Sequence, residues 1–149
     1  MRFLADAHLG KLARTLRLLG FDTALFGEGP DDDLIALAKA EERHVLTRDR
    51  ELWERLGKQA TYVASTNPEA QAEETVARLG LASAARPFTR CTVCNTLLEE
   101  VPKERILERL PPKVCGFCHH FRLCPGCGRL YWQGTHYHRM ERLVRHLTG

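Results

Sequence analysis

In the first eighty residues, short apolar runs alternate with longer stretches in which apolar residues recur every three or four positions. The short runs predict strands, and the longer stretches predict amphipathic helices. Leu12, Leu16 and Leu19 show the helical spacing, and Gly20 follows where helices commonly end. The pattern predicts strands at residues 2–5, 23–26, 45–47 and 60–63, and helices at residues 11–19, 31–40, 50–56 and 68–79.

Strands that alternate with helices in this way predict an α/β fold, in which a parallel sheet is flanked by helices. Asn67 and Pro68 support the last of these helices, because Asn is a favoured N-cap and Pro fits the first helical turn. A further amphipathic helix is predicted near the end of the chain, and its apolar positions are Met140, Leu143, Val144 and Leu147.

The six cysteines all lie in the last 59 residues, as three Cys-x-x-Cys pairs at Cys91–Cys94, Cys115–Cys118 and Cys124–Cys127. Each pair places two thiolates on one tight turn, and a tetrahedral zinc ion needs two such turns. No signal peptide or transmembrane run is recognisable, so we expect a cytoplasmic protein without a membrane partner, and cysteines that bind metal. We expect an α/β domain at residues 1–81, a linker at 82–90 and a small module held together by bound zinc at 91–149.

Six cysteines exceed the four ligand positions of one zinc ion. The first pair can share the ion with the second pair, across 20 residues, or with the third pair, across 29 residues. We favour the third pair, because Asn95 and Gly128 directly follow the last cysteine of each turn and tolerate a positive φ. The second pair would then supply free thiols, or a second metal site with one or more of His119, His120, His136 and His138.

Charge is unevenly distributed along the chain. Residues 1–90 carry 13 basic and 14 acidic side chains, whereas residues 91–149 carry nine basic and five acidic ones, together with five of the seven histidines. The basic excess of the second module favours a nucleic-acid partner, although four thiolates bound to Zn²⁺ would remove about two units of it.

Acidic residues follow three of the predicted strands: Asp6, the run Asp31–Asp33, and Asp49. Each of them can also be interpreted as a turn or helix-cap residue. The carboxyl ends of parallel strands meet at one edge of a sheet, however, so we expect the acids to share a pocket. Clustered carboxylates need a divalent cation, oxygen ligands favour Mg²⁺ or Mn²⁺, and such a site can hydrolyse a phosphodiester.

Basic residues accompany these acids. Lys11, Arg14 and Arg48 are placed to hold phosphate groups beside the metal. Arg17 is interpreted equally well as an ordinary solvated residue on a helix surface.

Longer motifs resemble the Mut-seven C-terminal RNase domain family, a PIN-like nuclease module with an appended zinc ribbon. The resemblance is carried by residues 3–6, 9–14, 16–22, 46–50, 67–71, 91–95, 101–104 and 124–136, and so covers nearly the whole chain. It implies a metal-dependent ribonuclease, and a zinc ribbon held by Cys91, Cys94, Cys124 and Cys127.

The acids that match the family pattern are Asp6, Asp49 and one residue of the acidic run, where the register favours Asp31 with Asp32 next. Two departures stand out. Cys115 and Cys118 lie where the family usually has other residues. The fourth acid that PIN-like nucleases often carry near the fourth strand is replaced by the neutral Ser65, Thr66 and Asn67, of which Asn67 is a weak ligand at best.

The sequence thus predicts an enzyme that hydrolyses RNA phosphodiester bonds with one or two Mg²⁺ or Mn²⁺ ions between Asp6, Asp31 (or Asp32) and Asp49. The zinc ribbon would aid RNA binding through basic side chains and through aromatic rings that either stack on bases or pack on the zinc core. These side chains are Arg122, Arg129, Arg139, Arg142 and Arg145, and Tyr131, Trp132 and Tyr137.

Two other classes of protein compete with this interpretation. One is a non-catalytic adaptor that binds nucleic acid or protein on a degenerate PIN-like scaffold, which the missing fourth acid favours. The other is a receiver-like phospho-acceptor domain, which would need paired acids after the first strand and a lysine after a late strand. Only Asp6 follows the first strand, so we rank this class third.

Overall fold

The computed structural model describes residues 1–116 and 118–149, and of Cys115 the backbone alone. Residues 1–81 form the part that we call the α/β module. Its parallel strands are β1 (Arg2–Ala5), β2 (Asp22–Leu25), β3 (His44–Thr47) and β4 (Ala60–Tyr62). Its helices are α1 (Gly10–Leu18), α2 (Asp31–Ala40), α3 (Arg50–Leu56) and α4 (Pro68–Leu79). The strands and helices that the hydrophobic pattern predicts are therefore all present.

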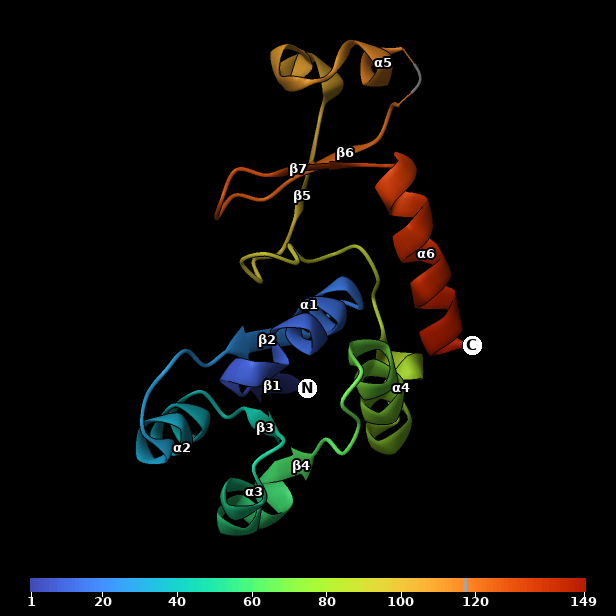
Figure 1. The fold of residues 1–149 in the computed structure, drawn as a ribbon. Helices are drawn as coiled ribbons and strands as arrows, with labels where there is room; N and C mark the ends of the chain where they lie inside the picture. The colour runs from blue at the N-terminus through green and yellow to red at the C-terminus, as the bar shows by residue number, and fades with distance from the viewer. Residues whose placement is uncertain (117) are drawn as a thin grey trace.

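The four strands are parallel and lie in the order β2-β1-β3-β4 (Figure 1). The chain leaves β1 for β2 on one side and then returns across β1 to β3 on the other side. The direction of winding therefore reverses between β1 and β3. In open α/β sheets, ligands bind outside the carboxyl ends of the strands at this reversal.

Alternate residues of the strands enter two different cores. Phe3 and Ala5 pack in one core with side chains of α1 and α4, whereas Leu4 packs in the other with side chains of α2 and α3. This alternation follows from the two-residue period of a strand, and it explains why β1 is apolar at every buried position. The parallel sheet flanked by helices on both faces is confirmed.

Residues 91–149 form the part that we call the ribbon module. Its antiparallel sheet has the order β5-β6-β7, made of β5 (Glu99–Val101), β6 (Phe121–Leu123) and β7 (Leu130–Trp132). Between β5 and β6 lie two short 3-10 turns and helix α5 (Pro112–Cys115). Ile106, Leu110 and Val114 of this segment pack with Phe121 in a third core.

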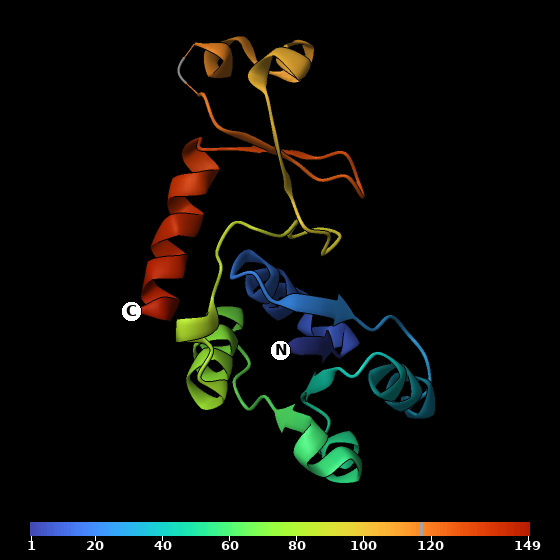
Figure 2. The same cartoon turned by 180° about the vertical axis from the view of Figure 1, so that it is seen from behind.

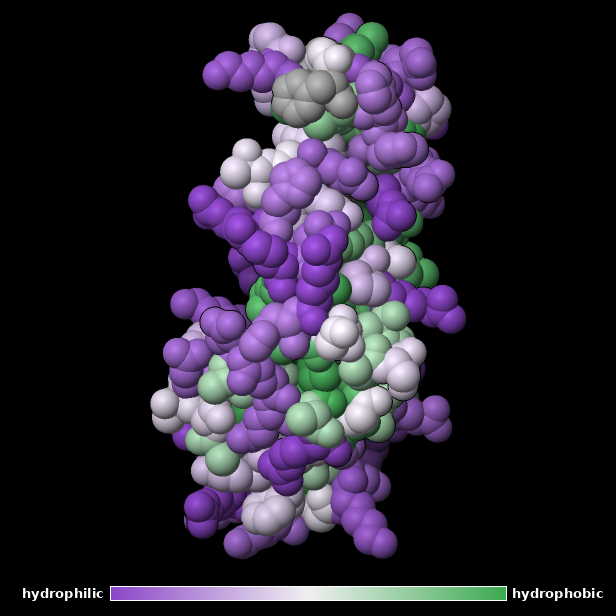
Figure 3. Space-filling model, turned by 90° about the vertical axis from the view of Figure 1, so that its right-hand side faces the viewer, coloured by the Kyte–Doolittle hydropathy of each residue, from purple (hydrophilic) through white to green (hydrophobic). Residues whose placement is uncertain are grey.

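The last helix, α6 (Thr135–Thr148), connects the two modules. It runs from the ribbon sheet to α4, and the C-terminus lies beside α4 (Figures 1 and 2). Val144 and Leu147 are buried in the first core of the α/β module, with Met140 and Leu143 partly buried against it. The side of the molecule on which α6 lies is mostly hydrophilic, with smaller hydrophobic areas between the hydrophilic side chains (Figure 3). The predicted apolar face of this helix is thus its contact face.

The start of the ribbon module is also hydrogen-bonded to the α/β module. Arg17 of α1 is buried, and its guanidinium donates from Nε to Thr23 O (2.8 Å) and from Nη1 to Thr92 O and Val93 O (3.1 Å each). Asn95 Oδ1 accepts from the backbone N–H of Thr23 (3.0 Å). Interpreting Arg17 as a solvated surface residue is therefore wrong, because its side chain binds the loop that carries Cys91 and Cys94.

The segment between the modules passes close to the end of α1. Gly20 has φ +94°, and a Cβ there would lie 2.2 Å from the Arg86 carbonyl oxygen. The backbone N–H of Arg86 donates to Leu19 O (2.7 Å), and that of Phe88 donates to Leu18 O (3.0 Å). Only glycine allows both the turn and this close approach at position 20.

Candidate active site and cysteine cluster

Asp6 and Asp49 are joined through one buried hydroxyl at the carboxyl end of the sheet. Thr47, the last residue of β3, donates from Oγ1 to Asp6 Oδ2 (3.0 Å) and accepts from the backbone N–H of Asp49 (3.0 Å). Thr47 is fully buried, whereas Asp6 is half-buried and Asp49 exposed. This bridge spans β1 and β3, the place where the winding of the sheet reverses.

Both acids also satisfy the backbone groups that follow them. Asp6 Oδ1 accepts from the N–H of Ala7 (2.8 Å). Asp49 Oδ1 caps α3 by accepting from Glu51 N–H (2.9 Å) and Leu52 N–H (3.3 Å). The capping role weighed from the sequence is therefore present at Asp49, and it occupies only one of the two carboxylate oxygens. A carboxylate has about four lone-pair sites, so each acid keeps acceptor capacity towards solvent.

The acidic run lies in the first turn of α2, and its N-cap is Pro30 rather than an acid. Asp31 is half-buried, and among the described residues its side chain makes no direct hydrogen bond or ion pair, although its charge also acts on Arg55. Asp32 is exposed, and its Oδ1 accepts from Arg55 Nη2 of α3 (2.6 Å). The two candidates for the third acid thus differ in their surroundings, since Asp32 already has a cationic partner.

The three predicted acids follow neighbouring strands, but their carboxylates are not in direct contact as a group. Among the described side chains, the groups of three or more ligand atoms lying within 4.8 Å of one another do not include Asp6, Asp31 and Asp49 together. A metal at this edge would need some of these side chains to move inward, or would be held partly by water.

The basic residues predicted to bind phosphate differ in what they contact. Lys11 and Arg14 are exposed on α1. Arg48 is exposed but engaged, since it donates from Nε to Val63 O and from Nη2 to Ala64 O, both at 3.1 Å. Arg48 therefore holds the end of β4 against the end of β3, and only part of its guanidinium remains for a ligand.

One acid near the end of β4 was not predicted. Glu74 of α4 accepts from the backbone N–H of Ala64 (2.9 Å) and from Ser65 Oγ (3.3 Å). Its carboxylate thus lies beside the segment in which the sequence offers only neutral oxygens. The sequence alone carries no signal for this contact. In the structure, Glu74 lies three residues after the buried Gln71, whose Nε2 donates to Ser65 O, and residues three apart share one helix face.

The four cysteines predicted to bind zinc lie together at the start and in the middle of the ribbon module. Their sulfur atoms are all within 4.8 Å of one another. Cys91 Sγ lies 3.7 Å from Cys127 Sγ, and Cys94 Sγ lies 3.2 Å from Cys124 Sγ. Four sulfurs bound tetrahedrally at about 2.3 Å from zinc would be about 3.8 Å apart, so this donor set fits a four-thiolate zinc site.

The two cysteine turns have the same backbone geometry. In the first turn, the Asn95 N–H donates to Cys91 O (2.9 Å); in the second, the Gly128 N–H donates to Cys124 O (2.8 Å). Asn95 has φ +71° and Gly128 has φ +78°. The sequence analysis paired these turns because a residue that tolerates a positive φ follows each second cysteine. The observed backbone has a positive φ at both of these residues.

The thiols of this cluster have different electrostatic surroundings. Hydrogen bonding to the side chain and the backbone of Thr96 lowers the pKa of Cys94 to about 6. Burial raises the pKa of Cys124 to about 11. The Tyr131 hydroxyl lies 2.9 Å from Cys91 Sγ, and burial together with this contact raises the pKa of Tyr131 to about 12. The raised pKa thus favours the protonated Tyr131 hydroxyl beside the Cys91 sulfur.

The remaining cysteine pair does not join this cluster. Cys118 is buried in the third core, and its Sγ lies 3.8 Å from Gln133 O. The side chain of Cys115 lies outside the described residues. No group of metal-binding side chains within 4.8 Å in the described part of the chain contains Cys118. A second group does occur on the surface between α4 and α6, and it consists of Glu69, Glu73 and His146.

The fold and the site define a small α/β protein with an acidic edge and a cysteine-bound ribbon. The family model of the Mut7-C RNAse domain matches residues 1–144 of the 149-residue chain, so the protein belongs to this family. This membership indicates a nuclease, and it implies RNA as the substrate. No curated protein and no solved structure gives a significant match. Among the described residues, no helix has the length and apolar character needed to span a membrane.

Proposed function

We propose that the protein is a metal-dependent ribonuclease that hydrolyses RNA phosphodiester bonds at the carboxyl edge of its parallel sheet. The observation that carries this proposal is the bridge from Asp6 through Thr47 to Asp49 across the reversal of the sheet. It occurs in a chain that belongs to an RNase domain family. The two acids lie at the position in the sheet at which α/β proteins commonly bind their ligands.

The donor set at this edge fits Mg²⁺ or Mn²⁺, because both ions prefer carboxylate oxygens. Asp6, Asp31 and Asp49 would hold the ion, with Asp32 adjacent to Asp31. When bound, such an ion lowers the pKa of a coordinated water and offsets charge on the phosphoryl group. Glu74 is placed to fill the role of the fourth acid, because its carboxylate lies beside Ala64 and Ser65 at the end of β4.

The residues around the acids orient them and attract the RNA backbone. Thr47 fixes the rotamer of Asp6 and ties the backbone of Asp49 to the same hydroxyl. Lys11 and Arg14 are exposed and offer charged donors to phosphate oxygens. Arg48 joins the ends of β3 and β4 through its bonds to Val63 O and Ala64 O, and its other N–H groups would be available to a phosphate.

We further propose that Cys91, Cys94, Cys124 and Cys127 bind one structural zinc ion. The support is the close grouping of their sulfurs and the matched backbone of the two turns. Structural zinc sites are closed by four protein ligands, and small modules commonly depend on them for folding. The zinc would hold the ribbon sheet together, and so hold the basic and aromatic side chains that the ribbon offers to RNA.

The proposal is tested by a cleavage assay on labelled single-stranded and hairpin RNA, with Mg²⁺, Mn²⁺ or EDTA. The parent should cleave with metal and not with EDTA. An Asp6→Asn variant should lose about a hundredfold or more in rate, the scale on which loss of one contact to developing charge lowers kcat. The matched control is Asp33→Asn, which changes an exposed acid in the first turn of α2. Equal cleavage by the parent and Asp6→Asn would overturn the proposal.

The separation of the three predicted acids favours one alternative, a non-catalytic adaptor that binds RNA on the same scaffold. The same assay distinguishes the two functions when it is combined with a binding measurement. RNA binding that needs neither Mg²⁺ nor Mn²⁺ and is never followed by cleavage when these ions are added would establish the adaptor.

A further inference from the structure

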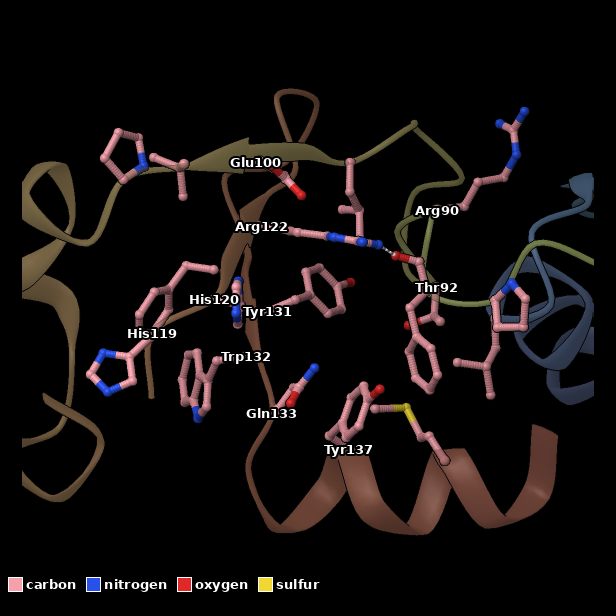
Figure 4. A pocket seen from close by; sticks show the side chains of 18 residues that line it. Arg90, Thr92, Glu100, His119, His120, Arg122, Tyr131, Trp132, Gln133 and Tyr137 are labelled. Atoms are coloured by element: carbon pink, nitrogen blue, oxygen red, sulfur yellow. Dashed lines mark hydrogen bonds between the residues drawn. The ribbon is translucent and has the colours of Figure 1, made fainter. Parts of the chain in front are cut away.

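A large pocket lies outside the acidic edge, between the two modules. Its volume is about 790 Å³, within the range of about 300–1,000 Å³ typical of ligand sites. Its walls come from the segment between the modules, the ribbon sheet, α6 and the end of α1 (Figure 4). We call it the aromatic pocket and define it by Phe88, Arg122, Tyr131, Trp132 and Tyr137.

The aromatic rings of this pocket are held in place by neighbours. The rings of Phe88 and Tyr137 lie 4.5 Å apart between centroids, with 33° between their planes. Tyr131 is anchored by its contact with Cys91 Sγ. Trp132 is only partly buried against the third core, and Figure 4 shows it across the pocket from Tyr137, with Gln133 between them. Ordered, partly exposed rings are the surfaces on which unpaired bases stack.

The charged groups of the pocket favour an anionic ligand. Arg90 and Arg122 line it, against the single acid Glu100 among the described lining residues. Arg122 reaches across the pocket and donates from Nη1 to the Phe88 carbonyl (Figure 4). A guanidinium has five N–H donors, so Arg122 keeps further N–H groups that can donate to a ligand. Aromatic rings beside arginine match a nucleotide, which combines a base that stacks with a phosphate that carries charge.

The position of the pocket relates it to the acidic edge. Leu18, at the end of α1, lines the pocket, whereas Asp6 lies before the start of α1. The nine residues of α1 extend about 13 Å, so the two sites lie towards opposite ends of this helix. Lys11 and Arg14 are exposed, and they precede Leu18 by seven and four residues, which places the three positions along one helix face. Two exposed basic side chains therefore lie along α1 between its pocket end and its acidic end.

We infer that the aromatic pocket binds an unpaired nucleobase of the RNA strand whose phosphodiester lies at the acidic edge, with the intervening backbone along Lys11 and Arg14. This inference rests on the proposed function, because it takes the acids as the site of cleavage. It makes the enzyme selective for single-stranded RNA, since a base within a duplex cannot enter the pocket.

The first test is binding of a labelled oligoadenylate to zinc-loaded Asp6→Asn protein without added Mg²⁺ or Mn²⁺, so that no cleavage occurs and the ribbon keeps its zinc. Adding Trp132→Leu should weaken binding about 5- to 150-fold, the equivalent of the stacking of one base. The matched control is Trp53→Leu, which changes a tryptophan of α3 that packs on Tyr62, far from the pocket walls. Binding that is equally tight in both variants would overturn the inference.

Trp132 also contacts the third core, so a measurement with the pocket intact is needed. In a Trp53→Phe background, Trp132 is the one tryptophan of the chain, and oligoadenylate should quench its fluorescence to saturation. The matched RNA duplex should not. Saturable RNA binding without any change in this fluorescence contradicts the inference.

The two proposals fail in different ways. If RNA quenches Trp132 but no metal ion supports cleavage, the nuclease proposal is wrong and the pocket is still a base-binding site. If Trp132→Leu keeps its zinc and cleaves single-stranded RNA with the KM of the parent, the pocket inference is wrong and the nuclease proposal stands.

Discussion

Thr47 shows how one residue can position two others at the acidic edge. Its side chain is fully buried, and its hydroxyl both donates to Asp6 and accepts from the backbone of Asp49. A buried hydroxyl is costly unless it is hydrogen-bonded, so this geometry is strongly preferred over other rotamers. Asp6 is therefore held towards β3 before any ligand arrives.

The choice between Asp31 and Asp32 is a prediction at the same scale. Asp31→Asn should lower metal-dependent cleavage about a hundredfold, because it removes the charge of one proposed metal ligand. Asp32→Asn should leave cleavage within about a factor of five of the parent, because Asp32 is paired with Arg55 and that exposed pair contributes little. Initial cleavage rates at several Mn²⁺ concentrations measure both effects. The reverse order of the two variants would assign the third acid to Asp32.

At the scale of elements, the sequence specified most of the fold because the chain follows local rules closely. Asn67 caps α4 and Pro68 occupies its first turn, as expected. The pairing of the cysteine turns could be predicted, because Asn95 and Gly128 report a backbone requirement at their own positions. These features depend on residues that are neighbours in the sequence, so they can be recognised from a single sequence.

Features that depend on contacts between distant elements were not predictable. Glu74 reaches the end of β4 only because α4 packs beside that strand end. Arg17 sits at a position that helical periodicity alone cannot distinguish from a solvated one, and it is buried only because the first cysteine turn docks on α1. Cys118 looks like a metal ligand in its spacing, yet it packs in an apolar core.

The cysteine cluster leads to a prediction for the ribbon as an element. Cys124→Ser should lose bound zinc and the folded ribbon sheet, because a structural zinc site needs all four ligands. Cys118→Ala is the matched control and should retain one zinc per chain, since Cys118 belongs to the third core. Zinc content by elemental analysis and ribbon signals by NMR measure the outcome. Stoichiometric zinc in Cys124→Ser would instead implicate the Cys115–Cys118 pair.

At the scale of the whole molecule, the ribbon is attached to the α/β module in two places. Arg17 of the α/β module donates to the first cysteine turn. Asn95 of this turn donates in return from Nδ2 to Asp22 Oδ1 (2.7 Å). The last helix returns and buries Val144 and Leu147 against the first core. The aromatic pocket lies between these two attachments, so its shape depends on how the modules are docked. Zinc binding, docking and RNA binding should therefore be coupled.

This coupling is tested by two arginines of the same helix. Arg17→Met should lower the free energy of unfolding by about 2–4 kcal/mol, because it leaves carbonyls of Thr23, Thr92 and Val93 without their charged donor. It should also weaken oligoadenylate binding, because the first cysteine turn, which forms part of the pocket wall, would lose its anchor on α1. Arg14→Met should leave stability unchanged, because Arg14 is exposed, and should weaken RNA binding with a smaller salt dependence. Urea denaturation and a salt series of binding curves separate the two. If Arg17→Met reduced RNA binding only through the salt dependence, with full stability, Arg17 would be a phosphate contact and the ribbon would not rely on it for docking.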